Sequence, residues 1–333
     1  VAHLPANLHP GHLAAISEDV DCVLVSGDSL CSEASEMPIF EQASDAPFRS
    51  LAPLNAEAAT IVLHTSGTTG APKPLSKALR CLEAEIAVLE QVFGSLCSGL
   101  VLATVRPYHI YGLLFRVLWP LASGRAFACD TIRLPTDLSA ALRQWPKPTL
   151  ISSPAFLKRS LDSLDLDAPG LRLGTVYSSG GPLPAHVAAG YAEHLDQPVV
   201  EVYGSTETGG IAYRSVRRAT GAVPWTVFPG ITVSLAEESD RLAIKSPYLM
   251  TADWYVTADR VKFLTDGRFH LRGRADRIVK LEEHRVSLSE IEERLAESPD
   301  VEAAHVLTRM VAEGERSILA AVVIPSKAGW AAL

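Results

Sequence analysis

The sequence predicts an α/β protein, with a large domain built on mainly parallel sheets and a smaller second domain. Short apolar runs typical of buried strands alternate with runs of helical period, which is the pattern of βαβ units around a parallel sheet. With 333 residues, the chain is long enough for about two domains. Apolar residues make up 47% and charged residues 20% of the chain, so disorder and a fibrous repeat are both excluded.

The first part of the chain carries the alternating pattern. Strands are predicted at residues 21–26, 60–64, 171–177 and 197–203. A helix is predicted after residue 78, because apolar residues recur there at three- and four-residue steps: Leu79, Leu82, Ile86, Leu89 and Phe93. A Gly/Thr-rich turn over 65–73 precedes it, so strand, loop and helix are expected in that order. Another helix is predicted over 184–195.

After Gly209 the pattern changes to short β-like runs separated by Gly, Pro and Asp, which predicts an antiparallel β lobe. These runs cover residues 226–228, 231–235, 242–245 and 268–271. A basic, polar stretch then predicts a boundary near Asp276, between a large domain over 1–275 and a small α+β domain over 276–333 that is incomplete here. The small domain is expected to contain strands at 278–281 and 317–325 and a helix over 288–296.

Charge and cysteine content exclude several classes of protein. A net charge of −8 disfavours binding to a nucleic-acid backbone, which needs clustered Lys and Arg. Five cysteines without a C-x-x-C pair indicate reduced thiols in a cytoplasmic protein. No run approaches the ~18 apolar residues of a membrane span. The chain begins with Val1, and its last predicted strand ends close to Leu333, so we expect a sequence cut at both ends.

One segment combines hydroxyls, glycines and a lysine within nine residues: Thr65, Ser66, Gly67, Thr68, Thr69, Gly70 and Lys73. Backbone N–H groups and hydroxyls in such a loop can surround an anion while the lysine meets its charge, which predicts a phosphate loop. The spacing differs from the common NTPase loop, because only two residues separate its glycines. An ordinary Gly/Ser/Thr turn is the alternative.

A second segment follows the strand predicted at 197–203 and contains Tyr203, Thr206 and Glu207. At the carboxyl end of a parallel strand, an aromatic face, a hydroxyl and a carboxylate suit a base, a phosphate and a magnesium ion. A helix N-cap with a glutamate in its first turn is the alternative.

Taken together, these segments resemble the adenylate-forming superfamily of acyl-CoA synthetases, adenylation domains and luciferases. The matching segments keep the family's order along the chain: residues 65–73, 107–109, 179–183, 203–207, Asp259, and 273–276 with Lys280. The resemblance implies an AMP-forming acid–thiol ligase that uses ATP and Mg²⁺. A carboxylate attacks the α-phosphate, and the acyl group then passes to the thiol of CoA or of a carrier protein's phosphopantetheine.

The resemblance also implies roles for single residues. The loop with Lys73 would hold the β- and γ-phosphates, Thr206 the α-phosphate, and Glu207 the magnesium ion. Adenine would lie between the backbone of Gly180, Gly181 and Pro182 and the ring of Tyr203. Asp259 would accept hydrogen bonds from the ribose hydroxyls, with Arg274 behind it, and Asp276 would be the hinge of the small domain.

His109 lies between two tyrosines, a setting that also fits a packed, hydrogen-bonded histidine. The resemblance implies instead that it lies beside the reacting carboxylate. Residues 107–114 include no acidic residue to pair an α-ammonium, and their apolar and aromatic side chains suit an aryl or hydrophobic acyl acid. The expected partners are therefore such a small carboxylic acid and, as thiol donor, CoA or an acyl carrier protein.

Two departures from the family pattern weaken the expectation of thioester formation and of adenylation. Glu283 or His284 stands where members have a glycine beside the pantetheine arm, and no segment like that of the family's adenylation lysine precedes Leu333. The chain is therefore expected to bind nucleotide but to adenylate poorly. A catalytically silent nucleotide-binding relative, or a free-standing adenylation domain of a polyketide or aryl-polyene pathway, are the alternatives.

Overall fold

The computed structural model describes residues 2–3, 23–24, 54–65, 73–97, 99–164, 172–194, 198–216, 223–281, 284–310 and 317–332. The chain divides into two compact units. The first contains residues 1–232 and 245–253, and the second contains 233–244 and 254–333. The α/β class is confirmed, with parallel and antiparallel sheets in one chain. No helix among the described residues has the length and apolarity to cross a membrane.

The first unit is built on a six-stranded sheet in the order β10-β9-β8-β7-β6-β5. Four neighbouring strands are parallel: β5 (Val101–Ala103), β6 (Thr149–Ser152), β7 (Val176–Ser178) and β8 (Val199–Ser205). Two further strands, β9 (Gly209–Val216) and β10 (Thr226–Val227), extend the sheet in antiparallel fashion. The strands predicted at 171–177 and 197–203 are thus β7 and β8, although β7 begins only at Val176.

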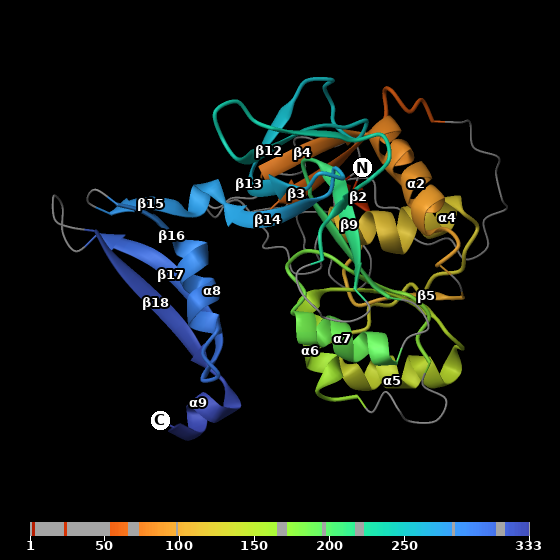
Figure 1. Cartoon of the computed structure of the whole chain (residues 1–333). Helices are drawn as coiled ribbons and strands as arrows, with labels where there is room; N and C mark the ends of the chain where they lie inside the picture. The colour runs from red at the N-terminus through yellow and green to blue at the C-terminus, as the bar shows by residue number, and fades with distance from the viewer. Residues whose placement is uncertain are drawn as a thin grey trace. The chain divides into compact units, whose positions relative to one another are not determined.

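Helices cover both faces of this sheet (Figure 1). One layer contains α5 (Pro135–Gln144), α6 (Pro154–Leu161) and α7 (Ala185–Glu193), where the helix at 184–195 was expected. The other contains α2 (Leu79–Phe93) and a continuous helical stretch formed by α3 (Ile110–Gly112), η2 (Leu113–Leu118) and α4 (Trp119–Ala122).

Alternating strand residues build the two cores, since successive side chains point to opposite faces of a sheet. Leu150 and Val176 face the α5–α7 layer. Their neighbours Ile151 and Tyr177 face the α2 layer, where Phe93 packs edge-on against Tyr177 with ring centroids 5.2 Å apart. The carboxyl ends of β5–β8 are therefore fixed from both sides.

A second sheet of the first unit has the order β2-β1-β3-β4: β1 (Ala2–His3), β2 (Val23–Leu24), β3 (Thr60–Thr65) and β4 (Lys73–Ala78). The expected order of strand, loop and helix was wrong here, because β4 lies between the loop and α2. It pairs with β3 in antiparallel register from Thr60 opposite Ala78 to Thr65 opposite Lys73. Lys77 occupies an inward-facing position of β4, so the strand lacks the apolar alternation that would have predicted it.

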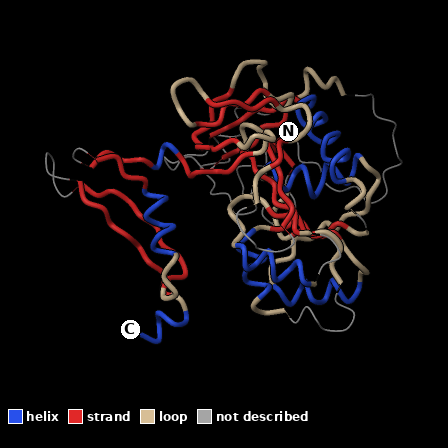
Figure 2. The backbone as a smooth tube through the Cα atoms, viewed as in Figure 1, coloured by secondary structure: helices blue, strands red, loops and turns tan. Residues whose placement is uncertain are grey.

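The second unit contains the predicted antiparallel lobe, a sheet of β11 (Thr232–Leu235), β12 (Arg241–Lys245), β13 (Tyr255–Phe263) and β14 (Phe269–Arg274). Two hairpins follow, β15 (Ile278–Leu281) with β16 (His284–Ser287), and β17 (Val301–Met310) with β18 (Ser317–Pro325). Helices α8 (Leu288–Ala296) and α9 (Lys327–Ala332) complete the unit, as Figure 2 shows by element type. Asp276 lies in the single turn η3 (Ala275–Arg277), and its role as a hinge stays a prediction.

Candidate active site

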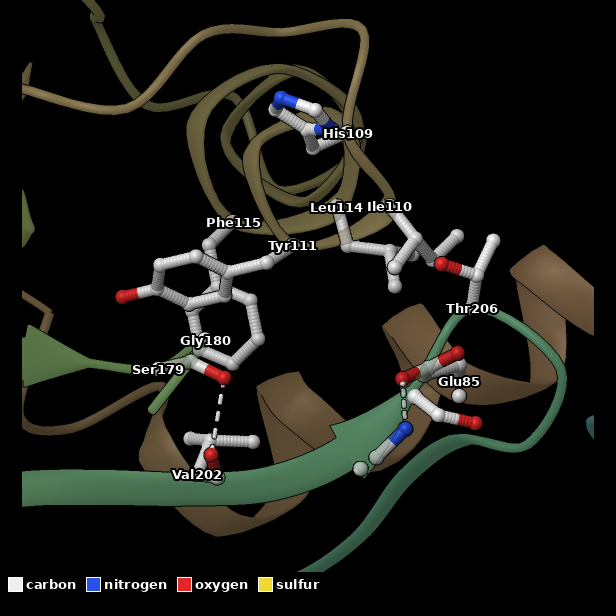
Figure 3. A pocket seen from close by; sticks show the side chains of 14 residues that line it. Glu85, His109, Ile110, Tyr111, Leu114, Phe115, Ser179, Gly180, Val202 and Thr206 are labelled. Carbon is white, nitrogen blue, oxygen red and sulfur yellow. Dashed lines mark hydrogen bonds between the residues drawn. The ribbon is translucent and has the colours of Figure 1, made fainter. Parts of the chain in front are cut away.

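A pocket of about 240 Å³ opens at the carboxyl ends of β7 and β8 (Figure 3). Ser179 and Gly180, directly after β7, and Ser205 and Thr206, at the end of β8, contribute to its lining. This is the edge at which open α/β sheets bind ligands. The strands that the sequence predicted there, β7 and β8, therefore lead into part of the pocket lining.

The pocket has an apolar side and a polar side. Tyr111 and Phe115 lie across the cavity from Glu85 and Thr206 in Figure 3. The apolar side comes from the helical stretch that begins at Ile110, whose side chains belong to the core between α2 and the sheet. A planar, largely apolar ligand with a few polar groups suits such a lining.

The turn between β8 and β9 places Thr206 at the pocket. The backbones of Gly204 and Gly209 approach so closely that a Cβ at Gly204 would lie 2.1 Å from the Gly209 carbonyl oxygen. The turn is closed by Thr208, whose hydroxyl accepts the N–H of Ser205 at 3.0 Å and donates to the Gly209 carbonyl at 2.8 Å. Only glycine at position 204 permits this approach, so Thr206 and Glu207 project from a fixed turn.

An ion pair between β8 and β9 supports the segment that follows β7. Glu201 on β8 lies opposite Arg214 on β9, and the two form a bidentate pair with N–O distances of 2.8 and 2.9 Å. Glu201 also accepts the backbone N–H of Leu183 at 3.3 Å. Gly180 adopts a left-handed conformation with φ of 87°, and the space around its Cα is open. The backbone before Leu183 is thus presented to the pocket.

Tyr203 belongs to a cluster of planar groups on this sheet. Its ring centroid lies 5.5 Å from that of Trp225, and the Arg214 guanidinium lies 4.5 Å from the Trp225 centroid. These contacts are in the range of aromatic and cation–π packing, which orients the Tyr203 ring.

The structure brings three predicted residues together in the lining: His109, Gly180 and Thr206. Four more predicted residues do not line the pocket but belong to β8 or to the segments that follow β7 and β8: Gly181, Pro182, Tyr203 and Glu207. Of the predicted phosphate loop, residues 66–72 lie outside the described part of the chain, and Thr65 and Lys73 are placed as backbone at the ends of β3 and β4. Asp259 and Arg274 belong to the second unit, where they form an ion pair at 3.7 Å.

His109 precedes the first turn of α3 and is exposed at the pocket. Partial desolvation of its ring and the nearby Arg106 guanidinium lower the pKa of His109 below its ordinary value of 6.5. Figure 3 shows the ring beside the start of this helix. At neutral pH the imidazole is therefore uncharged, and it can donate one hydrogen bond and accept another.

Glu85 and Lys77 are buried ionisable groups that no sequence motif indicated. Glu85 on α2 lines the pocket, its Oε1 accepts the N–H of Gly210 at 2.6 Å, and burial raises its pKa to about 7. Lys77 on β4 donates to the Tyr248 carbonyl at 3.0 Å, and burial lowers its pKa. The burial of Glu85 could have been predicted from its position, since it follows Leu82 by three residues and therefore lies within the apolar stripe of α2.

Glu207, in the turn after β8, is the carboxylate that could hold a magnesium ion at this edge of the sheet. The described residues contain no cluster of three or more His, Cys, Asp or Glu side chains that could hold a metal alone. Mg²⁺ commonly uses one or two carboxylates together with substrate phosphates and water, so a single glutamate fits an ion that arrives with a nucleotide. The negative charge of Glu207 also acts on Lys77, which places it near the buried pair.

Comparison with known proteins also indicates a family of nucleotide-binding enzymes. The family model "AMP-binding enzyme" matches residues 6–243. A 4-coumarate–CoA ligase of Rhodobacter capsulatus is 32% identical over 254 residues, which cover 74% of this chain and 60% of the relative. Surfactin synthase subunit 1 of Bacillus subtilis is 26% identical over 321 residues, covering 82% of this chain and 9% of that protein. The chain thus spans about 60% of the ligase that it matches.

Solved structures share the fold. The O-succinylbenzoate coenzyme A synthetase of Bacillus subtilis, in complex with AMP, superposes with a TM-score of 0.78 at 18% identity, covering 98% of this chain and 73% of that one. A benzoate CoA ligase from Burkholderia xenovorans gives a TM-score of 0.76 at 18% identity, covering 98% and 73%.

Proposed function

Because this chain belongs to the family of AMP-binding enzymes, we propose that it activates a carboxylic acid with ATP as an acyl-adenylate. The acyl group then passes to a thiol, on CoA or on a carrier protein's phosphopantetheine. The observation that carries the proposal is the pocket at the carboxyl ends of β7 and β8, with His109, Gly180 and Thr206 in its lining.

In this reaction the carboxylate of the acid attacks the α-phosphate of ATP, and pyrophosphate leaves. The enzyme's task is to position the two anions and to stabilise the charge that develops between them. Thr206, fixed on its turn, donates a hydrogen bond to an α-phosphate oxygen. The uncharged His109 donates a hydrogen bond to the acid, which orients the attacking oxygen and leaves its negative charge on the carboxylate.

We assign the following groups to the nucleotide. Adenine lies between the backbone of Gly180, Gly181 and Pro182 and the ring of Tyr203. The loop that ends at Lys73 holds the β- and γ-phosphates, and Glu207 holds the magnesium ion. Asp259 accepts hydrogen bonds from the ribose hydroxyls, with Arg274 behind it.

The acid is an aryl or hydrophobic acyl acid. Ile110, Tyr111, Leu114 and Phe115 supply the apolar side of the pocket, and a flat or extended apolar chain buries its surface there. The 4-coumarate–CoA ligase is named for CoA, and the match to surfactin synthase subunit 1 supports the carrier-protein alternative.

Isotope exchange tests the proposal directly. The purified protein, extended past Leu333, is incubated with Mg·ATP, labelled pyrophosphate and a panel of aryl and fatty acids, and label in ATP is measured. Exchange that depends on one class of acid supports the proposal. If ATP binds in calorimetry but no acid promotes exchange, the chain is a catalytically silent nucleotide-binding relative.

A further inference from the structure

The turn between β8 and β9, which carries Thr206, is hydrogen-bonded to Glu85 on α2. The Gly210 N–H donates to Oε1 of Glu85 at 2.6 Å, although the two residues are 125 positions apart in the sequence (Figure 3). The hydrogen bonds of Ser205 and Thr208, by contrast, stay within the turn and the start of β9. Those bonds fix the shape of the turn, whereas the bond to Glu85 fixes where the turn lies against α2.

The backbone beside Gly210 packs against the same carboxyl. Gly209 has a φ of 69°, and a Cβ there would lie 2.5 Å from Oε2 of Glu85. On its other side, the carbonyl oxygen of Gly209 is so close to Gly204 that a Cβ at Gly204 would lie 2.1 Å from it. Gly209 is therefore enclosed between the carboxyl and the end of β8, and a shift of the carboxyl would shift the turn.

Glu85 is itself held in place. Only 2% of its surface is exposed, and its neighbours on the same face of α2, Leu82 and Leu89, are buried as well. Lys77 on β4 donates to the Tyr248 carbonyl at 3.0 Å and lies close enough for its charge to act on the pKa of Glu85. The carboxyl is thus enclosed by α2, β4 and the turn.

The second carboxyl oxygen of Glu85 does not face a ligand. Oε2 is buried against Gly209 and has no hydrogen-bond partner among the described residues. Burial of a carboxyl with an unsatisfied oxygen is unfavourable, and burial raises the pKa of Glu85 to about 7. Departures of this kind from ordinary packing are expected at functional positions. The contact that Glu85 makes at this position is with the turn.

We propose that Glu85 is a positioning residue of the adenylation reaction, whose carboxyl fixes, through the Gly210 N–H, the turn from which Thr206 reaches the α-phosphate. The inference rests on the proposed function, because that function assigns Thr206 to the phosphate. Rates depend strongly on such supports, since a misplacement of about 1 Å can cost about a hundredfold.

Two substitutions of Glu85 separate its hydrogen bond from its charge. Glu85→Asp keeps the charge but withdraws the carboxyl by about 1.5 Å, one carbon–carbon bond, so the bond to the Gly210 N–H is lost. Glu85→Gln loses the charge but keeps an oxygen for the same N–H. Dissociation constants of AMP are measured by calorimetry, with no turnover required. We expect Glu85→Asp to weaken AMP binding by about tenfold, and Glu85→Gln by less than about threefold.

A double-mutant cycle tests whether Glu85 acts through Thr206. Thr206→Val removes the hydroxyl but keeps the shape of the side chain, and it should weaken AMP binding by about tenfold. With Glu85→Asp added, the loss should stay near tenfold, because the displaced turn has no hydroxyl left to misplace. An effect of Glu85 on the fold in general would instead multiply the two losses to about a hundredfold.

Further variants guard against misfolding. Glu85→Met has a similar length and no strong acceptor, so it breaks the bond in a second way and takes the place of Glu85→Asp if the latter does not fold. Glu83→Gln, at an exposed position of α2, is the control and should leave AMP affinity unchanged. Circular dichroism establishes that each variant is folded at the temperature of the titration.

The outcomes are distinct. Normal AMP affinity in the variants that break the bond, an equal loss in Glu85→Gln, or a hundredfold loss in the double variant would each overturn the inference, even with pyrophosphate exchange intact. A tenfold loss that Glu85→Gln avoids and that is coupled to Thr206 supports it, even if no acid promotes exchange. If the unaltered chain binds no AMP, the inference and the proposed function both fail.

Discussion

At the scale of single residues, the most direct prediction concerns the carboxylate of Glu207. Glu207→Gln removes the negative charge proposed to hold magnesium while keeping the shape of the side chain, and the turn from Ser205 to Thr208 does not use that side chain. We expect Mg²⁺-dependent pyrophosphate exchange to drop by at least about a hundredfold, as when a group that stabilises the transferring phosphoryl is lost. The melting temperature should change little. An exchange rate near that of the unaltered chain would remove Glu207 from the site.

The buried carboxyl of Glu85 predicts a pH dependence of stability. Its pKa is raised from 4.5 to about 7 on folding, so the folded state binds more protons than the unfolded state between these values. The free energy of unfolding therefore falls as pH rises through this window, by about 3 kcal/mol for the full shift. The Glu85→Gln variant lacks this titrating group. Its free energy of unfolding should therefore rise relative to that of the unaltered chain by about 3 kcal/mol between pH 4.5 and pH 8.

Urea unfolding at several pH values measures this difference. Glu83→Gln, exposed on the same helix, is the control and should show a constant difference from the unaltered chain across the range. A Glu85→Gln difference that is equally flat would show that Glu85 ionises in the folded state as it does in the unfolded one.

At the scale of elements, Glu201 links three of them: β8, β9 and the segment after β7. Removing one partner of a buried ion pair leaves the other charge uncompensated, at a cost of about 3–5 kcal/mol. Because Arg214 keeps 20% of its side-chain surface exposed, we expect Glu201→Gln to lie at the lower end, at about 3 kcal/mol of unfolding free energy. The segment before Leu183 would lose its anchor, so AMP affinity should fall as well.

The matched control is Glu193→Gln, at the exposed end of α7. It should leave both the unfolding free energy in urea and the AMP affinity from calorimetry unchanged. Should Glu201→Gln destabilise the fold but bind AMP normally, the ion pair would be structural only, and the adenine would not rest on the segment from Gly180 to Pro182.

The sequence predicted β7, β8 and α2 but not the helical stretch from Ile110 or β9, which also contribute to the pocket, and the reason is local. Residues 199–203 are apolar apart from Glu201 and are followed by turn residues, so β8 and the position of Thr206 followed from pattern alone. β4 was missed because Lys77 is buried in it and Pro74 interrupts it, both against strand propensity. Glu85 was missed for a related reason, since a glutamate on an apolar stripe is ordinarily solvated and only the backbone of Gly209 and Gly210, distant in sequence, shows that it is buried.

At the scale of the whole molecule, the two units differ in how much core each contains. Both large clusters of buried apolar residues belong to the first unit, on the two faces of the six-stranded sheet. In the second unit, β17 and β18 form a two-stranded hairpin, and its β18 residues Val322 and Ile324 are 60% and 52% exposed. A two-stranded hairpin is only marginally stable unless further strands or a helix pack against it. In this hairpin the buried residue Val306, on β17, provides such a contact.

Local stability should therefore fall along the chain. Amides that exchange through local opening report few buried contacts, whereas those of a central strand report global unfolding. In hydrogen exchange followed by mass spectrometry, we expect peptides from β18 to exchange at least about a hundredfold faster than peptides from β7 and β8, a ratio that corresponds to ~3 kcal/mol of opening free energy. The comparison is made within one sample, so stability of the chain as a whole cancels. Equal protection of β18 and β8 would mean that the hairpin is stabilised by contacts beyond those of α8 and β17, and would contradict a separation of the chain into units of unequal stability.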